Sequence, residues 1–233
     1  MSAIKTVIIH GQSHVGSTCH IARALAEKLG GETTEFFLPR DFGAYCVACL
    51  NCFSKTEKMC PHYQALAPIT QAIDAADVVI LASPVYVFHA TGAMKAFLDH
   101  YGYRWMVHSP EPCMFKKQGV CIATAAGAGM RSTNKDMADS LFFWGVPRIY
   151  KIGVGMNAIN WESASAKKKD AIDRRTTALA KQICARVGKV KPGLKTKAMF
   201  AIARLFQKKN GFSSRDARHW EAHGWFGKER PWD

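Results

Sequence analysis

Along this chain, short apolar runs alternate with longer segments in which apolar residues recur at helical spacing. The run Ile4–His10 is rich in β-branched residues and ends at a glycine, as buried parallel strands do. The segment Ser17–Leu29 repeats apolar residues along one face and ends at two glycines, which predicts a helix. Further strands are predicted at 33–38, 77–82, 119–124 and 148–154, and further helices at 63–76, 92–101, 133–144 and 163–187.

Strands that alternate with helices in this way indicate an α/β domain, with an open parallel sheet covered on both faces. A chain of 233 residues is long enough to form one sizeable core of this kind. In such sheets ligands bind beyond the carboxyl ends of the strands. The loops that follow the predicted strands are therefore the candidate functional site.

The first of these loops, Gly11–Thr18 (GQSHVGST), nearly matches the phosphate-binding pattern G-x4-G-K-[ST], but Ser17 replaces the lysine. A triphosphate needs that lysine, whereas a single phosphate can be held by backbone N–H groups, hydroxyls and a helix N-terminus. Ser13, Gly16, Ser17 and Thr18 are therefore candidates to bind a monophosphate. The alternative is an ordinary strand–helix turn in which a serine caps the helix.

Two later loops contain residues that could bind a flat ring. The loop Ser83–His89 (SPVYVFH) follows the most apolar strand and contains a proline and two aromatic residues. The loop Thr124–Met130 (TAAGAGM) consists of small residues, which leave backbone N–H and C=O groups free to bind a heterocycle. Each loop alone also fits a structural role, in the core or as a linker. Together with the monophosphate loop they indicate FMN.

Four of the eight cysteines lie close together in the sequence, as Cys46, Cys49, Cys52 and Cys60, and Pro61 follows the last. The pattern C-x2-C-x2-C followed by C-P is typical of iron–sulfur ligands, and it predicts a [4Fe-4S] cluster. Two alternatives remain open at this point. One is zinc, for which His62 would be a further ligand, and the other is a set of reduced thiols or a redox pair.

The formal net charge is +14, and residues 161–233 carry 18 Lys and Arg against 7 Asp and Glu. Such a basic segment can bind nucleic acid, an anionic membrane or an acidic protein partner, but the simplest interpretation is a solvated surface. No base-reading module and no membrane-spanning run is visible, so nucleic acid and membrane partners are not expected. The start MSAIKTVIIHG predicts a strand and not a signal peptide, which indicates a cytoplasmic protein.

The last part of the chain departs from the strand–helix pattern. Pro192 and Gly193 end the preceding helix, and 199–206 then form an apolar face on a short basic helix. This helix is expected to dock on its own domain or on a neighbouring subunit, and less readily on a membrane. Trp220, Trp225 and the other aromatic residues near the end are costly to expose and are expected to cover a partner subunit.

The strand–GQSHVGST–helix unit, the segment SPVYVFHATGAMKAFLDH and the loop 124–129 resemble the NAD(P)H-dependent FMN reductase family of flavodoxin-like proteins. The cysteine quartet resembles the iron–sulfur flavoprotein branch of that family, and the resemblance covers about residues 4–190. It implies a flavodoxin-like doubly wound five-stranded parallel sheet, order 2-1-3-4-5, with a C-terminal helical extension. Residues 1–188 would be the FMN-binding domain with a cysteine-rich insertion at 41–62, and 189–233 a basic, Trp-rich extension.

The resemblance also implies an FMN-dependent oxidoreductase that uses NAD(P)H to reduce a flavin or another small acceptor, and that forms homodimers or homotetramers. The phosphate would be bound by Ser13, Gly16, Ser17 and Thr18. The ring would contact Pro84, Val85, Tyr86, Val87, Thr124, Ala125, Ala126, Gly127 and Gly129. The alternative functions are an electron carrier between protein partners and a basic adaptor without a redox cofactor.

Overall fold

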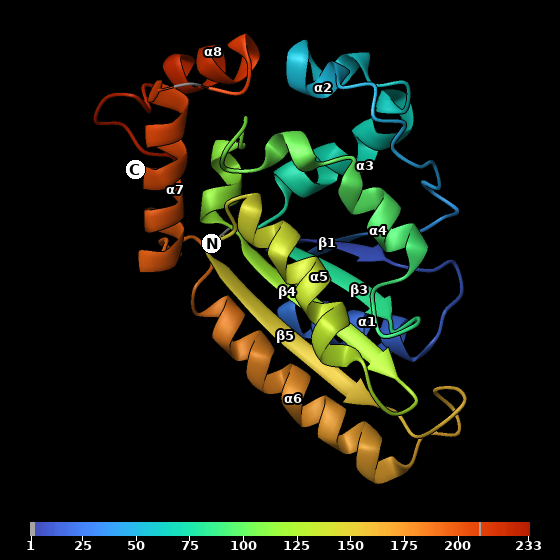
Figure 1. Ribbon diagram of the computed structural model, residues 1–233. Helices are drawn as coiled ribbons and strands as arrows, with labels where there is room; N and C mark the ends of the chain where they lie inside the picture. Colours follow the sequence, from blue (N-terminus) through green and yellow to red (C-terminus); the bar gives the residue numbers. More distant parts are fainter. Residues whose placement is uncertain (1–2, 210) are drawn as a thin grey trace.

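The computed structural model describes residues 3–209 and 211–233, and its centre is one parallel sheet (Figure 1). The strands are β1 (Lys5–His10), β2 (Glu32–Phe37), β3 (Val78–Pro84), β4 (Gln118–Ala125) and β5 (Arg148–Gly155). They lie in the order β2-β1-β3-β4-β5, and every neighbouring pair is parallel. This order is that of the flavodoxin-like fold, so the predicted fold class is confirmed.

Helices cover both faces of the sheet. The helices α1 (Ser17–Leu29) and α6 (Ala166–Cys184) pack on one face, and α3 (Tyr63–Ala75), α4 (Gly92–Asp99) and α5 (Met130–Phe143) pack on the other (Figure 1). Each face has its own apolar core because successive strand residues point to opposite sides. In β1, Ile8 belongs to the core under α1 and α6, whereas Val7 and Ile9 belong to the core under α3, α4 and α5.

Most of the helices differ from their predicted bounds by one to three residues at an end. The helix predicted to begin at Thr133 begins at Met130, because Gly129 with φ +94° forms its N-cap. Pro68 lies inside α3, in its second turn. Short elements that the pattern did not predict are α2 (Asn51–Ser54) and the 3-10 helices Glu57–Met59, Gly102–Arg104 and Pro112–Lys116.

The C-terminal extension packs on the chain's own domain. Its helices are α7 (Leu194–Lys209) and α8 (Ser214–Ala222), and they form a third apolar core with the segment between α4 and β4. Phe200 of α7 stacks on Trp220 of α8, with ring centroids 4.9 Å apart. The indole N–H of Trp220 donates a hydrogen bond of 2.6 Å to the carbonyl of His108. The expectation that Trp220 and Trp225 cover a partner subunit is therefore wrong, because their own chain buries both.

Replacing Trp220 with alanine should lower the free energy of unfolding by about 3–5 kcal/mol, the usual cost of removing a fully buried large aromatic side chain. Urea unfolding followed by circular dichroism would measure the change. Leu205→Ala is the matched control, because Leu205 lies on α7 with its side chain mostly exposed, and it should change the same quantity by less than about 0.5 kcal/mol. Equal effects of the two substitutions would show that the extension is not packed as described.

Candidate functional site

Loops that follow β1, β3, β4 and β5 meet at the carboxyl edge of the sheet and enclose a cleft of about 380 Å³. Predicted site residues that line this cleft are Gly16, Ser17, Thr18, Pro84, Val85, Tyr86, Thr124, Ala125 and Ala126. The structure therefore brings the loop Gly11–Thr18, which we call the phosphate loop, and both predicted ring loops to one place. We call this site the carboxyl-edge cleft.

The phosphate loop ends at the N-terminus of α1, which faces the carboxyl-edge cleft. Gly16 is the N-cap, no side chain caps the helix, and the first turn contains no acidic residue. The first N–H groups of a helix lack partners within the helix, and its dipole places partial positive charge at this end. The alternative of a serine-capped turn is thus not what forms here, and the end of the helix can accept an anion.

Gly11 at the start of this loop is needed for close contact with the β3–α4 loop. A Cβ atom on Gly11 would lie 2.9 Å from Thr91 Oγ1 and 3.0 Å from Ser83 Oγ. The Thr91 hydroxyl donates a hydrogen bond of 2.6 Å to the Gly11 carbonyl and accepts one of 3.1 Å from the N–H of Met94. The loop after β1 is thereby held against the loop after β3, which sets the relative position of two walls of the cleft.

Two predicted phosphate ligands have other partners. The hydroxyl of Thr18 is buried and hydrogen-bonds the hydroxyl of Thr124, which ties α1 to the end of β4. The hydroxyl of Ser13 donates a hydrogen bond of 3.3 Å to the carbonyl of Leu38, and Ser13 is not among the residues that line the cleft. Ser17 remains as the hydroxyl that is both in the cleft and at the first position of α1.

Three predicted ring-binding residues lie outside the lining of the cleft, namely Val87, Gly127 and Gly129. Val87 is 92% exposed and has φ +48°, because residues 86–89 form a tight turn closed by hydrogen bonds between Tyr86 and His89. Gly129 packs under that turn, since a Cβ atom there would lie 2.5 Å from Val85 Cγ1. Val87 and Gly129 thus shape the turn, while Pro84, Val85 and Tyr86 line the cleft.

The remaining wall is the loop after β5, a loop that follows a predicted strand but of which no residue was predicted to bind a ligand. Met156, Asn160, Trp161 and Glu162 line the cleft, and the N–H of Met156 donates a hydrogen bond of 2.8 Å to the carbonyl of Ala125. Trp161 stacks on His20 of α1, with ring centroids 5.0 Å apart. The signal was present in the sequence, because this loop also follows a predicted strand and contains the only tryptophan near such a position.

His10 lies at the end of β1, directly before the phosphate loop. Its ring is buried and stacks on Phe37, with centroids 4.3 Å apart. Burial lowers the pKa of His10 to about 4, and the nearby Glu35 opposes this only in part. His10 is therefore neutral near pH 7 and adds no positive charge beneath the loop, so the helix N-terminus is the main attraction for an anion.

The four clustered cysteines line a second pocket, of about 200 Å³. All are free thiols, and Cys46 and Cys49 are exposed. Burial, followed by the proximity of the other three thiols, raises the pKa of Cys52 to about 11. The backbone turns between the cysteines through Ala48 (φ +51°) and Leu50 (φ +58°), which are unusual values for residues other than glycine. The four cysteines thus share one pocket.

A tighter group of ligands lies at one end of that pocket. The ligand atoms of Cys60, His62 and His100 all lie within 4.8 Å of one another, and Nδ1 of His62 is 3.0 Å from Nε2 of His100. The other nitrogen of His100 lies 2.8 Å from the carbonyl of Ala96, which orients the ring. Within the described residues no other set of three such side chains is gathered this closely. Of the four clustered cysteines, only Cys60 belongs to this group.

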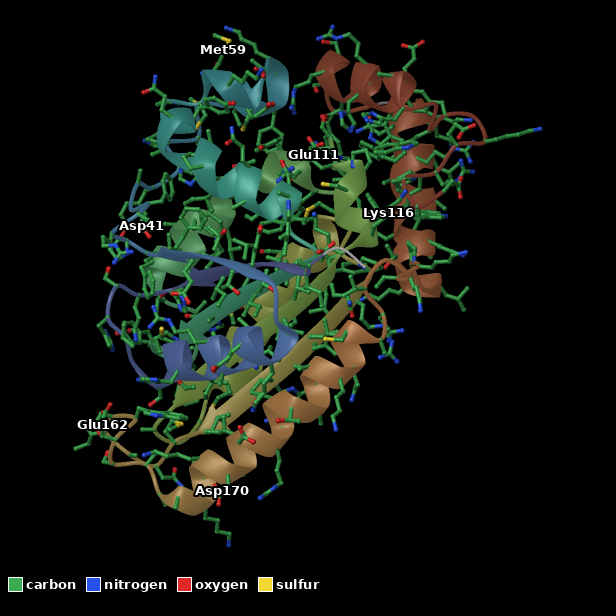
Figure 2. All side chains as sticks on the ribbon, turned by 180° about the vertical axis from the view of Figure 1, so that it is seen from behind. Asp41, Met59, Glu111, Lys116, Glu162 and Asp170 are labelled. Atoms are coloured by element: carbon green, nitrogen blue, oxygen red, sulfur yellow. The ribbon has the colours of Figure 1, made fainter. Side chains whose placement is uncertain are left out.

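The cysteine pocket and the carboxyl-edge cleft have no lining residue in common. The cysteine segment passes over α3 and reaches α8, where Nη2 of Arg215 lies 2.8 Å from a carboxylate oxygen of Glu57. Met59 of that segment and Glu162 of the cleft lie at opposite ends of the molecule (Figure 2). Within one chain the cysteine segment therefore extends away from the carboxyl-edge cleft.

The amino-acid sequence of the chain matches a known protein family. A family described as NADPH-dependent FMN reductase matches residues 4–160, which include the phosphate loop, both ring loops and the cysteine segment. The chain belongs to this family. The match ends within the loop after β5, so the C-terminal extension lies outside it.

One relative is named for an iron–sulfur group and a flavin. It is an iron-sulfur flavoprotein of Archaeoglobus fulgidus, 33% identical over 114 residues, which are 48% of this chain and 49% of that protein. The matched segment thus spans about half of the relative.

Solved structures resemble the chain in fold. A flavone reductase superposes with a TM-score of 0.57 at 16% identity, over 80% of this chain and 64% of that one. An FMN-dependent NADH-azoreductase from Bacillus anthracis, solved with FMN, gives a TM-score of 0.53 at 11% identity, over 79% of this chain and 99% of that one.

Proposed function

We propose that this protein is an FMN-dependent oxidoreductase that oxidises NAD(P)H and passes the electrons to a flavin or another small acceptor. The observation that carries the proposal is the uncapped N-terminus of α1, which opens into the same cleft as two loops suited to a flat ring. Bound FMN would supply the redox chemistry, accepting a hydride and releasing electrons singly or in pairs. The protein supplies binding, orientation and exclusion of water.

The lining of the cleft suggests how its residues would divide this work. The backbone N–H groups of the first turn of α1 and the hydroxyl of Ser17 would hold the phosphate. Val85 and Tyr86 on one side, and Ala125 and Ala126 on the other, would contact the ring. Tyr86 is held in place by a hydrogen bond of 3.0 Å from its hydroxyl to Oε1 of Gln12, so it is positioned before any ligand binds.

We further propose that Cys46, Cys49, Cys52 and Cys60 hold a [4Fe-4S] cluster. The four cysteines line one pocket, and their spacing in the sequence is typical of cluster ligands. The relative named an iron-sulfur flavoprotein is consistent with this proposal. The alternative to a cluster is a single metal ion. It would be bound by Cys60, His62 and His100, with one ion per chain.

Because Met59 of the cysteine segment and Glu162 of the cleft lie at opposite ends of the molecule, electrons would pass between the two sites most directly across a contact between two copies (Figure 2). The proposal therefore includes a homo-oligomer, a homodimer or homotetramer, in which the cysteine segment of one copy approaches the cleft of another. The turn 86–88 supports it, since three consecutive apolar residues beside the cleft are exposed.

Steady-state oxidation of NADPH and of NADH, with FMN, a quinone or ferricyanide as acceptor, tests the proposed activity. We expect sustained turnover with at least one of these acceptors and no need for a separate reductase. Turnover that appears only when a reductase is added would instead identify an electron carrier. A colourless protein without turnover would contradict both redox functions.

A further inference from the structure

Helix α7 is apolar on two opposite faces. One face carries Phe200 and Ala203 and is buried against the chain's own domain. The other face carries Leu194, Ile202 and Leu205, which are 87%, 61% and 60% exposed. Figure 1 shows α7 at the outer edge of the molecule, with the C-terminal loop beside its upper end and no other helix or strand on its outer side. An amphipathic helix needs only one apolar face to dock, so the second face remains to be explained.

The exposed face forms a regular stripe. At 100° per residue, Leu194, Ala198, Ala201 and Leu205 fall within a strip about 60° wide along the whole helix. Lys197 and Lys208 fall on one side of this strip, and Lys209 falls on the other. We call these seven residues the outer face of α7. An apolar stripe with lysines on both sides is typical of helices that lie in the interface of a bilayer.

The charge of α7 points to an anionic partner. The helix contains five basic residues and no acidic one. Two of the five are engaged by their own chain: Nζ of Lys195 lies 4.4 Å from the centre of the Phe142 ring, and Arg204 donates a hydrogen bond of 2.8 Å to the carbonyl of Phe226. Over residues 3–209 and 211–233, Lys197, Lys208 and Lys209 take part in no ion pair or side-chain hydrogen bond. Their charges are available to a ligand outside the chain.

We propose that the outer face of α7 binds the surface of an anionic phospholipid bilayer. Leucine side chains would enter the boundary between headgroups and acyl chains, and the flanking lysines would reach the phosphates. A second copy of the chain is a poor occupant, because two such helices would place like charges side by side. Nucleic acid would match the lysines but would leave the leucines exposed to water.

This binding would be peripheral. In the described part of the chain, no helix combines the length and apolar character needed to cross a bilayer. The carboxyl ends of β4 and β5 in Figure 1, and Glu162 of the cleft in Figure 2, lie on the side of the molecule away from α7. The carboxyl-edge cleft would therefore stay open to solvent when α7 is docked. The surface interaction is therefore separate from the proposed reductase function, and neither depends on the other.

Co-sedimentation of the full-length protein with sucrose-loaded vesicles tests the proposal. We expect the protein to bind vesicles of phosphatidylcholine with about one third phosphatidylglycerol at low salt, and to bind pure phosphatidylcholine far more weakly. Raising the salt concentration should release it, since salt screens exposed charges. Leu194→Ser combined with Leu205→Ser should weaken binding at least about tenfold, because two leucines lose their burial in the bilayer.

Substitutions of lysines on α7 and on α6 distinguish binding through the outer face of α7 from binding through the net positive charge of the whole chain. Lys197→Gln combined with Lys208→Gln should weaken binding by about fivefold for each lysine removed. Lys167→Gln combined with Lys181→Gln makes the same change in net charge on exposed positions of α6, and should change binding less than about twofold. All the substituted positions are exposed, so the unfolding midpoint should stay unchanged.

Several results would overturn the proposal. These are the absence of binding to anionic vesicles, equal binding to neutral ones, and unchanged binding by the leucine variant. If the α7 and α6 charge variants lost equal amounts of vesicle binding, the binding would depend on the net charge of the chain and not on the outer face of α7. If light scattering shows a dimer that the leucine variant splits, the outer face of α7 is instead a contact between copies.

Discussion

Replacing Ser17 with aspartate is expected to lower the affinity for FMN about a thousandfold. The substitution places a carboxylate at the first position of α1, in the cleft where the phosphate is proposed to bind. A carboxylate about 4 Å from a phosphate charge costs about 4 kcal/mol at an effective dielectric constant of 20. Fluorescence titration of the flavin-free protein with FMN would measure the loss.

The same substitution should not harm the fold. An acidic residue in the first turn interacts favourably with the helix dipole, so the flavin-free variant should unfold at the same denaturant concentration as the wild type or a higher one. Ser17→Asn is the neutral control, and it should retain affinity within about tenfold. If aspartate and asparagine weaken FMN equally, the phosphate does not bind at the N-terminus of α1.

Cys49→Ala should remove the iron and leave FMN bound. A [4Fe-4S] cluster needs its four ligands, and Cys49 lies in the cysteine pocket, which shares no lining residue with the carboxyl-edge cleft. Protein purified without oxygen should be brown, with about four irons per chain. The variant should be yellow, with less than about one iron per chain. Iron and sulfide assays, together with the absorption spectrum, give the result.

His100→Ala distinguishes the cluster from the mononuclear alternative. Cys49 is outside the group formed by Cys60, His62 and His100, whereas His100 is central to it. A cluster on the four cysteines predicts that Cys49→Ala loses the metal and His100→Ala retains iron. A single ion on the tighter group predicts the reverse pattern, with about one zinc per wild-type chain. That pattern would refute the cluster and leave the flavin proposal standing.

The sheet and the cleft could be predicted because their determinants are local. β-branched runs such as 4–10 define buried parallel strands, and the carboxyl ends of such strands meet at one edge. The missing lysine at position 17 indicated a monophosphate. The roles of Ser13 and Thr18 could not be predicted, because their partners Leu38 and Thr124 are distant in sequence.

The position of the cysteine segment depends on features that a sequence pattern does not show. Ala48 and Leu50 adopt positive φ without being glycine, and an ion pair between Glu57 and Arg215 joins residues that are 158 positions apart. The surface on which the C-terminal extension packs could not be predicted either. The apolar residues of the extension predicted docking, but the surface that receives Trp220 lies in the irregular segment before β4 and has no periodic signal.

Release of the bound flavin by denaturation tests the central claim most directly, because it asks whether the carboxyl-edge cleft selects one phosphate and one flavin. The supernatant of heat-denatured, freshly purified protein would be separated by chromatography and compared with FMN, FAD and riboflavin. The structure predicts FMN, approaching one per chain after incubation with FMN and removal of excess. FAD, or no flavin after such incubation, would contradict the account.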